Sequence, residues 1–485
     1  MIDPANLLPR ISDIVRSQAE RAPHAPALVE NGRNWTYGEL WQETERHAEL
    51  LRSLGVRAGD RVMLVGENCT AQLALLFAIS RLDAWSVNVN ARLSPAELAA
   101  IRAHCRPRRV LYTTAVSPEA LAHAERDGAQ AVGEIMAGPL DAGTEPEAVR
   151  TDGGQVAALV YTTGTTGQPK GVMLSHANLL FVAATSSNLR GLVASDQVAG
   201  VLPVSHVYGL TSVMLGTLYA GACLHLAPRF DAAALLGQIR GGVLTIVQGA
   251  PAMYARLLAM AGPGAAIPSR LRFLYAGGSP LDPGLKRAVE HAFGLPLHNG
   301  YGLTESAPTV CQTRLDAPRT DTSVGHPIPG VEVRIEGNGE LWVRGPNVMA
   351  GYYRDPAATK AALRPGGWLA TGDLAAQDAD GALFIQGRLK ELIIRAGFNV
   401  HPPEVEAALN SHPGVLQSAV VGRPVADGDE EVVAFVEARE EVDIDELRAW
   451  LRPRLAPYKR PSRIVFMDAL PAAPSGKVLK HLLGP

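Results

Sequence analysis

The sequence predicts a large N-terminal α/β domain with layered, parallel-rich sheets and a small β-region, followed by a small α+β domain. Over roughly the first 300 residues, short β-rich runs alternate with helical patterns, as in parallel sheets covered by helices. Between 310 and 385 the pattern changes to short strands broken by turns, and after Gly387 it becomes compact and mixed. We expect the N-terminal domain to span residues 1–388 and the C-terminal domain residues 389–485.

The alternation begins early in the chain. Expected strands lie at 61–65, 86–90 and 110–112, and helices at 71–82 and 94–104. Ser94 is followed three residues later by Glu97, a capping-box signature that sets the start of the second helix. Residues 114–154 are weakly patterned and rich in Ala, Gly and Glu, so we expect a surface connection there.

From residue 156 onward the same periods continue. A helix is expected from about His176. Expected strands of the large domain lie at 156–161, 171–174, 244–247 and 271–276, and those of the β-region at 331–335, 340–345 and 382–387. The C-terminal part has expected strands at 418–422, 430–438 and 463–467, and helices at 402–412 and 443–453.

Composition excludes several classes of protein. The chain has 485 residues, of which 47% are hydrophobic and 19% charged, so a mostly disordered protein is excluded. The net charge of −3 argues against a basic surface that binds nucleic acid or anionic lipid. The short basic group Arg106, Arg108 and Arg109 is expected to be ordinary solvated surface.

Cysteine usage and hydropathy predict a cytoplasmic protein. Four widely spaced cysteines without a CxxC pair argue against a disulfide framework and against a structural zinc site. The first residues lack the apolar core of a secretory signal. The most apolar stretch, 71–79, is followed closely by Arg81 and Asp83, too soon for a bilayer span, so no stable membrane insertion is expected.

The strongest local signal is YTTGTTGQPKG at residues 161–171. Glycines let backbone N–H groups turn inward, threonines add hydroxyl donors and Lys170 adds charge, a set that suits phosphate oxygens. It is not a Walker A loop, because GxxxxGK[ST] is absent and a strand pattern follows. An ordinary Gly/Thr hairpin is the alternative.

This stretch resembles the phosphate loop of the adenylate-forming superfamily, which includes acyl-CoA synthetases, firefly-type luciferases and peptide-synthetase adenylation domains. Thr163 stands where Ser is more usual. Further segments match in the family's order: LPVSH at 202–206, YAGGSP at 275–280, NGYGLTES at 299–306, WLATGD at 368–373, GRLKELI at 387–393, GFNV at 397–400 and PSGK at 474–477. In motif the chain is most similar to 4-coumarate–CoA ligase-like and fatty-acid–CoA ligases.

The resemblance implies a site for ATP with Mg²⁺. Implied nucleotide-binding residues are Thr162, Thr163, Gly164, Thr165, Thr166, Gly167, Lys170, Gly277, Gly278, Ser279, Asn299, Gly300, Tyr301, Gly302, Thr304, Asp373 and Arg388. Glu305 is the implied metal ligand, and Lys477, His206, Thr304 and Glu305 are the implied catalytic residues.

The residue types fit these roles, although each has a plainer alternative. Glu305 offers a hard oxygen for Mg²⁺, or is a solvated turn acid. The Tyr301 ring between glycines suits a purine, or simply packs in the core. Asp373 can accept from ribose hydroxyls, or only forms a turn, and Arg388 can hold ribose or phosphate, or a surface ion pair. His206 flanks the substrate carboxylate, or is merely packed.

The implied reaction has two halves. A carboxylic acid and ATP form an acyl-adenylate and pyrophosphate, and a thiol then displaces AMP. In this family the C-terminal domain rotates between the halves, with Lys390 at the hinge position and Lys477 serving the first half. The implied coenzyme A-binding residues are Arg395, Ala396, Gly397 and Phe398.

The implied acyl pocket is apolar or neutral. It is formed by His206, Tyr208, Tyr275, Gly278, Gly302 and Ser306. Malonate-type enzymes carry an arginine where this chain has Gly300, so a dicarboxylate is disfavoured. An aromatic acid of the hydroxycinnamate or benzoate type and a medium-chain fatty acid both fit, and the two tyrosines favour the aromatic acid.

Three functions remain open from the sequence. The first is an AMP-forming acid–CoA ligase, a monomer or homodimer. The second is an adenylating enzyme that loads a carrier-protein phosphopantetheine in trans. The third, a non-catalytic nucleotide-binding protein, is disfavoured because Lys170, Glu305, Asp373, Arg388 and Lys477 are all retained.

Overall fold

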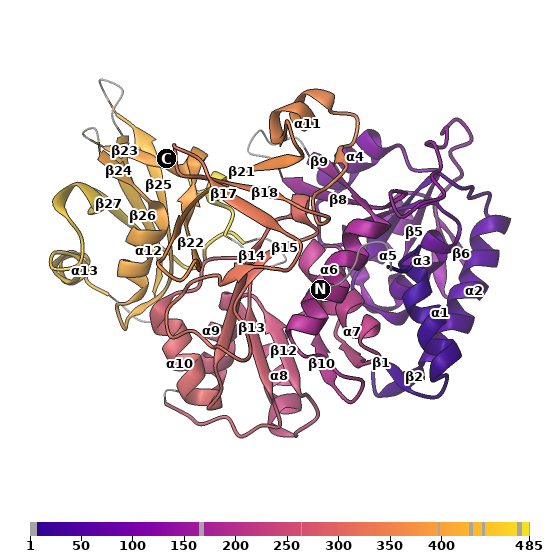
Figure 1. Cartoon of the computed structure of the whole chain (residues 1–485), viewed down its shortest axis with the longest axis horizontal. Coiled ribbons are helices and arrows are strands. Elements are labelled where there is room, and N and C mark those ends of the chain that lie inside the picture. The colour runs from indigo at the N-terminus through magenta and orange to yellow at the C-terminus, as the bar shows by residue number, and fades with distance from the viewer. Residues whose placement is uncertain are drawn as a thin grey trace.

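The fold is built on two large sheets and two smaller groups of strands. The computed structural model describes residues 7–163, 169–262, 264–395, 398–425, 430–438, 442–472 and 478–484, with only the backbone of Thr163. Figure 1 shows the chain passing from the N-terminal elements at one end of the molecule to the C-terminal elements at the other.

The first large sheet has eight strands and a parallel centre. Its order is β19 (Gly351–Tyr352), β9 (Pro169–Ser175), β8 (Val156–Thr163), β4 (Trp85–Asn90), β3 (Arg61–Gly66), β5 (Arg109–Tyr112), β7 (Ile135–Ala137) and β6 (Gln130–Val132). Strands β8, β4, β3 and β5 are parallel neighbours. The strands expected at 61–65, 86–90 and 110–112 are confirmed within one residue at each end.

The second large sheet has nine strands. Its order is β16 (His326–Pro327), β15 (Thr309–Gln312), β14 (Leu297–Gly302), β13 (Phe273–Ala276), β12 (Ile246–Gly249), β10 (Gln197–Gly200), β11 (Cys223–Leu226), β1 (Pro26–Glu30) and β2 (Arg33–Thr36). The strands from β14 to β1 are parallel, and the edges are antiparallel.

Helices cover and separate these sheets. They are α1 (Ser12–Arg21), α2 (Tyr37–Ser53), α3 (Thr70–Arg81), α4 (Pro95–Cys105), α5 (Pro118–Arg126), α6 (His176–Leu189), α7 (Gly216–Tyr219), α8 (Ala232–Arg240), α9 (Pro251–Ala261), α10 (Pro283–Phe293) and α11 (Pro356–Ala362). Residues 208–215 form a π-helical segment before α7. The Ser94 capping box is confirmed: its Oγ accepts from the Glu97 N–H and Glu97 accepts from the Ser94 N–H.

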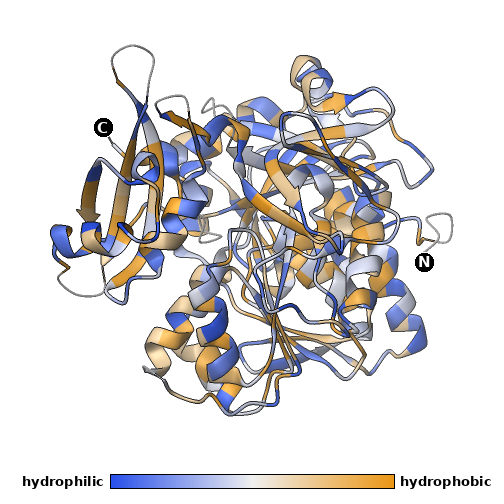
Figure 2. Ribbon diagram, turned by 60° about the vertical axis from the view of Figure 1, so that its left-hand side comes forward, coloured by the Kyte–Doolittle hydropathy of each residue, from blue (hydrophilic) through white to orange (hydrophobic). Residues whose placement is uncertain are grey.

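Helices α3 and α6 lie inside the fold. Phe77 of α3 and Phe181 of α6 belong to one buried cluster with Leu64 of the eight-stranded sheet and Val198 of the nine-stranded sheet. Most residues of both helices are buried on every face, the small polar ones included, as expected for helices without a solvent face. The apolar stretch at 71–79 is therefore the sequence of a helix buried inside the protein. Figure 2 shows hydrophobic strands, in orange, in the interior.

The smaller strand groups complete the chain. The β-region contains β17 (Glu332–Ile335), β18 (Glu340–Arg344), β20 (Leu363–Arg364), β21 (Trp368–Gln377) and β22 (Leu383–Arg388). The C-terminal part contains β23 (Ile393–Arg395), β24 (Phe398–Val400), α12 (Pro402–Asn410), β25 (Val415–Pro424), β26 (Glu430–Ala438), α13 (Ile444–Leu451) and β27 (Arg463–Met467). Its buried cluster joins Ile393, Val405, Val432 and Leu447 and is separate from that of the large sheets.

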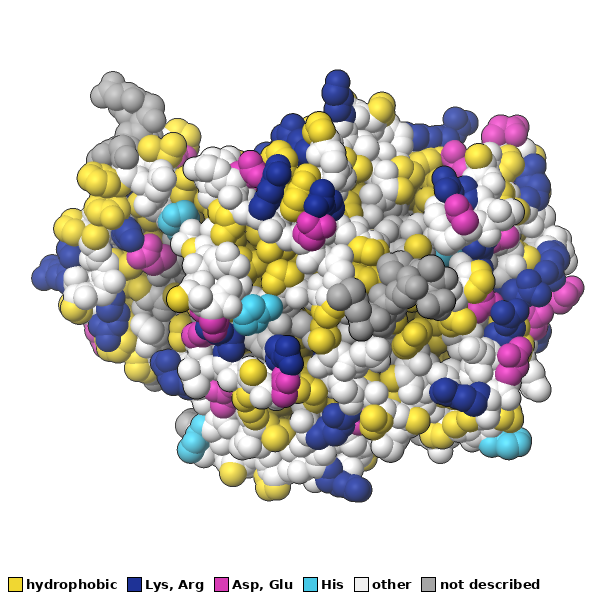
Figure 3. Space-filling model, in the orientation of Figure 1, with side chains coloured by type: hydrophobic (Ala, Val, Ile, Leu, Met, Phe, Trp, Pro, Cys, Tyr) yellow, Lys and Arg dark blue, Asp and Glu magenta, His cyan; other side chains and the backbone are white. Residues whose placement is uncertain are grey.

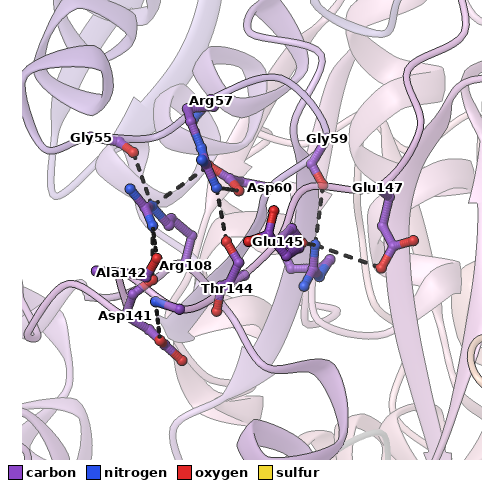
Figure 4. A network of polar contacts seen from close by, with 12 residues as sticks. Gly55, Arg57, Gly59, Asp60, Arg108, Asp141, Ala142, Thr144, Glu145 and Glu147 are labelled. Atoms are coloured by element: carbon purple, nitrogen blue, oxygen red, sulfur yellow. Dashed lines mark hydrogen bonds and ion pairs between the residues drawn. The ribbon is translucent and has the colours of Figure 1, made fainter.

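Two local expectations were wrong. Residues 114–154 are not only a surface connection, because they form α5 and the hairpin β6–β7, which extends the sheet beyond β5. Arg108 is not solvated surface: its side chain is 11% exposed and donates to the carbonyls of Gly55, Asp141 and Ala142. Figure 4 shows these bonds fastening the segment after β7 to the sheet. These three carbonyls belong to residues outside the strands, so they accept from the Arg108 guanidinium instead of from a neighbouring strand.

The surface carries both charges. In Figure 3, Lys and Arg are interspersed with Asp and Glu over the face shown. Among the helices that the structure describes, none is both long enough and apolar enough to cross a bilayer. All four cysteines are buried and free.

Candidate active site

A cleft of about 1840 Å³ lies where the parallel strands end and the C-terminal part begins. Open α/β sheets bind ligands outside the carboxyl ends of their strands, and this cleft has that position. Seventeen of the residues expected from the sequence line it: Thr162, Lys170, His206, Tyr208, Tyr275, Gly277, Gly278, Ser279, Asn299, Gly300, Tyr301, Gly302, Thr304, Glu305, Asp373, Arg388 and Lys390.

The end of β14 requires glycine at two positions. A Cβ on Gly300 would lie 1.6 Å from Tyr275 Oη and 2.8 Å from the Cys311 carbonyl oxygen. A Cβ on Gly302 would lie 1.8 Å from the Pro308 carbonyl oxygen. The strand therefore reaches the cleft with bare backbone on both sides of Tyr301, and the Tyr275 ring fills the space beside Gly300.

Tyr301, Asp373 and Arg388 form one polar group. Asp373 on β21 and Arg388 on β22 are paired across the sheet, with Arg388 Nε 3.1 Å from Asp373 Oδ1. Tyr301 Oη donates to Asp373 Oδ2 at 2.5 Å. Burial, followed by the charge of Asp373, raises the pKa of Tyr301, so the phenol keeps the proton that it donates. The group presents a buried carboxylate and a half-exposed guanidinium to the cleft.

A second polar group surrounds Glu305. Tyr352 Oη donates to Glu305 Oε1 at 2.7 Å, and Lys170 Nζ lies 5.1 Å from the centre of the Tyr352 ring. Tyr352 was missed by the sequence interpretation. Its sequence signal is a Tyr-Tyr pair at 352–353, and such a pair by itself does not separate a site residue from a core residue.

An aromatic pocket forms the third part of the cleft. The Tyr208 and Tyr275 rings meet edge to face with their centroids 6.3 Å apart, and burial raises the pKa of both phenols. A Cβ on Gly277 would lie 3.4 Å from either ring, so this glycine leaves both ring edges uncovered by a side chain. His206 Nδ1 accepts from the Tyr208 N–H at 3.2 Å, which orients the imidazole at the pocket mouth. Tyr208 opens the π-helical segment, a conformation often found at functional sites.

Three expected residues lie away from the cleft lining. Ser306 is fully buried, and its hydroxyl donates to the carbonyls of Leu303 and Pro308, so it shapes the turn rather than the acyl pocket. Arg395 donates to two backbone carbonyls, and Phe398 is 54% exposed and stacks on Tyr458. The expected residues Gly164, Thr165, Thr166, Gly167, Ala396, Gly397 and Lys477, and the Thr163 side chain, lie outside the described residues.

The donor set fits a magnesium nucleotide. Glu305 offers a hard oxygen ligand in the cleft that Lys170, the second residue of β9, also lines. Asp373 offers a carboxylate acceptor for hydroxyls, and the bare backbone of Gly300 and Gly302 permits close approach of a ring. The cleft is larger than the roughly 300–1,000 Å³ of a single-ligand pocket, so it has room for more than one substrate.

Comparisons with known proteins agree with this chemistry. A family model described as "AMP-binding enzyme" matches residues 15–353, and one described as "AMP-binding enzyme C-terminal domain" matches residues 404–477. The chain is 38% identical over 481 residues to the feruloyl-CoA synthase of an Amycolatopsis species, with 96% of each chain covered.

Solved structures are similar over nearly the whole chain. ATP-bound MatB from Rhodopseudomonas palustris has a TM-score of 0.85 at 30% identity, covering 97% of this chain and 98% of that one. The o-succinylbenzoate coenzyme A synthetase MenE from Bacillus subtilis, in complex with ATP and magnesium ion, has a TM-score of 0.83 at 28% identity, covering 97% and 98%.

Proposed function

This chain belongs to the AMP-binding enzyme family and is an AMP-forming acid–CoA ligase that uses ATP, Mg²⁺ and coenzyme A, and on that premise we propose that its substrate is an aromatic carboxylic acid. The observation that carries the proposal is the edge-to-face pair of Tyr208 and Tyr275 on either side of Gly277. Aromatic rings prefer such edge and offset contacts, so a pocket wall that carries these two rings favours a flat ring over a coiled alkyl chain. The similarity to a feruloyl-CoA synthase supports the same choice.

The first half-reaction joins the acid to AMP. A carboxylate oxygen attacks the α-phosphorus, and pyrophosphate leaves with the electron pair of the broken P–O bond. We assign Glu305 as a ligand of Mg²⁺, which supplies positive charge at the phosphates when bound. Lys170 and Thr162 lie at the same part of the cleft and would donate to phosphate oxygens, and Lys477 is assigned to bridge carboxylate and α-phosphate.

Nucleotide orientation is assigned to the polar group at β21 and β22. The Asp373 carboxylate accepts from ribose hydroxyls, while Tyr301 and Arg388 hold that carboxylate in place. His206 is assigned to the pocket mouth beside the reacting carboxylate. Because orientation lowers the entropy that must be lost in the transition state, errors in these contacts reduce rate more than stability.

In the second half-reaction the thiolate sulfur attacks the acyl carbon and AMP leaves. We propose that residues 389–485 rotate as a unit about Lys390 between the halves. Lys390 is exposed in a three-residue turn (Leu389–Glu391) between β22 and β23. The buried cluster that begins at Ile393 is separate from the one that contains Leu383, so turning here breaks little packing.

The test is acid-dependent pyrophosphate release and AMP formation across aromatic and aliphatic acids, with coenzyme A or a phosphopantetheinyl carrier protein as acceptor. We expect cinnamate-type acids to exceed octanoate, and coenzyme A to exceed the carrier. Preference for the aliphatic acid would refute the aromatic pocket, and preference for the carrier would favour the alternative acceptor.

Two variants test the rotation. Lys477→Ala should abolish adenylation yet convert supplied acyl-adenylate to thioester, whereas Gly397→Leu should do the reverse. Equal damage to both half-reactions in both variants would refute the assignment of these residues to separate halves.

A further inference from the structure

Arg190 is a buried arginine at the wall of the aromatic pocket. It follows α6, is 2% exposed, and lines the cleft. Its Nη1 donates to Gln248 Oε1 at 2.6 Å, and its guanidinium carbon lies 4.1 Å from the centre of the Tyr275 ring. Tyr275 belongs to the expected acyl pocket, so the guanidinium lies at that part of the cleft lining.

The guanidinium is incompletely satisfied. Its Nε has no hydrogen-bond partner, and no carboxylate forms an ion pair with Arg190 within the described parts of the chain. Most buried polar atoms in proteins have partners, and a buried charge without a counter-charge is unfavourable. The C-terminus of α6 offsets part of this charge through its dipole, but it supplies no acceptor for Nε.

Two more polar groups near this arginine lack partners. Tyr208 Oη and Gln248 Nε2 are buried and have no hydrogen-bond partner in the parts of the chain that the structure describes. Tyr208 contacts Tyr275 edge to face, and Gln248 holds Arg190, so all three donors are gathered around the Tyr275 ring. The wall that carries the Tyr208 and Tyr275 rings therefore holds several donor atoms without a hydrogen-bond partner among the described residues, although the Tyr275 hydroxyl also bonds Arg190.

We propose that Arg190, together with Tyr208, binds an acceptor oxygen carried by the ring of the substrate, and so selects oxygen-substituted aromatic acids over unsubstituted ones. This inference rests on the proposed function, since it needs an aromatic acid in the aromatic pocket. A phenolic or methoxyl oxygen and a second carboxylate share the required chemistry. A site built to bond an oxygen discriminates against the analogue that lacks it, because its buried donors are then left unpaired.

Wild-type enzyme with four acids gives the first test. The kcat/KM for acid-dependent pyrophosphate release is measured with cinnamate, 4-methylcinnamate, 4-hydroxycinnamate and 4-carboxycinnamate. We expect one of the two oxygen-bearing acids to exceed both cinnamate and its methyl analogue by about tenfold or more. Whichever of the two is preferred identifies the source of the acceptor. Equal values for all four acids would overturn the proposal, whereas no release with any acid would refute the proposed function instead.

Arg190→Met gives the second test, with Arg256→Met as its matched control, because Arg256 is an exposed arginine of the same cleft. We expect Arg190→Met to lower kcat/KM for the preferred acid about tenfold while cinnamate changes less than about threefold, and Arg256→Met to keep the wild-type ratio. Equal losses for both acids would make Arg190 a structural residue and overturn the proposal. Thermal unfolding checks that each variant folds. Should Arg190→Met not fold, Arg190→Lys, which keeps the charge but not the planar fork, is judged by the same ratio.

Discussion

Tyr352→Phe removes a single hydroxyl group from the cleft. That hydroxyl donates to Glu305 Oε1 at 2.7 Å, and the ring lies 5.1 Å from Lys170 Nζ. A hydrogen bond to a charged group contributes about 1.5–3 kcal/mol, and partial exposure of Glu305 reduces this to about 1–2 kcal/mol. At about 1.4 kcal/mol per factor of ten, the loss corresponds to about 5–30-fold.

The assay is the initial rate of pyrophosphate release as the Mg²⁺ concentration is varied at fixed ATP and acid. Because Tyr352 orients the assigned metal ligand, the variant should need about 5–30-fold more Mg²⁺ for half-maximal rate. The neighbouring Tyr353 gives a matched control, since its hydroxyl donates to Glu147 Oε1 at 2.6 Å away from the cleft lining. Tyr353→Phe should leave the Mg²⁺ dependence unchanged. The reasoning fails if the two variants shift that dependence equally, or if Tyr352→Phe does not shift it.

Further predictions concern the nucleotide, the acyl pocket and pH. Asp373→Asn keeps the shape of the side chain but removes its charge beside Arg388. In steady-state kinetics the KM for ATP should therefore rise about tenfold while the KM for the acid stays constant. An unchanged KM for ATP would contradict the assignment of Asp373 to the nucleotide. Gly300→Ala places a Cβ 1.6 Å from Tyr275 Oη. Overpacking of about 1–3 kcal/mol should lower kcat/KM for the acid about 5–150-fold, and Tyr275→Phe should partly relieve this loss. A fully active Gly300→Ala variant would show that the Tyr275 ring moves freely. Burial lowers the pKa of His176 to about 3. As the pH falls below about 6.5, His176 therefore gains a proton in the unfolded chain but not in the folded chain. This group alone should lower the free energy of unfolding by about 2 kcal/mol at about pH 5. Urea unfolding should show a smaller loss between neutral pH and about pH 5 for His176→Gln, and an equal loss would refute the linkage.

The sequence by itself determined the elements and most of the cleft. Strand and helix periods placed the parallel centre of the eight-stranded sheet and strands β12 and β13 of the nine-stranded sheet. Ser94 fixed a helix start through contacts only three residues apart. Gly300, Gly302, Asp373 and Arg388 could be identified because their segments resemble the motifs of a known family; their residue types suit bare backbone and nucleotide chemistry but did not decide the matter alone. The expected boundary at residue 388 and the roles of the site residues remain predictions.

Only the tertiary structure decided which polar groups face one another. Tyr352 reaches Glu305 across 47 positions, and Arg190 reaches Gln248 across 58, so neither pair leaves a local pattern. Ser306 belongs to a matching motif, yet its hydroxyl turns inward to the carbonyls of its own turn. Periodicity and residue type reflect the backbone near each position, whereas a buried donor's partner depends on how distant strands and helices pack, which no short segment encodes.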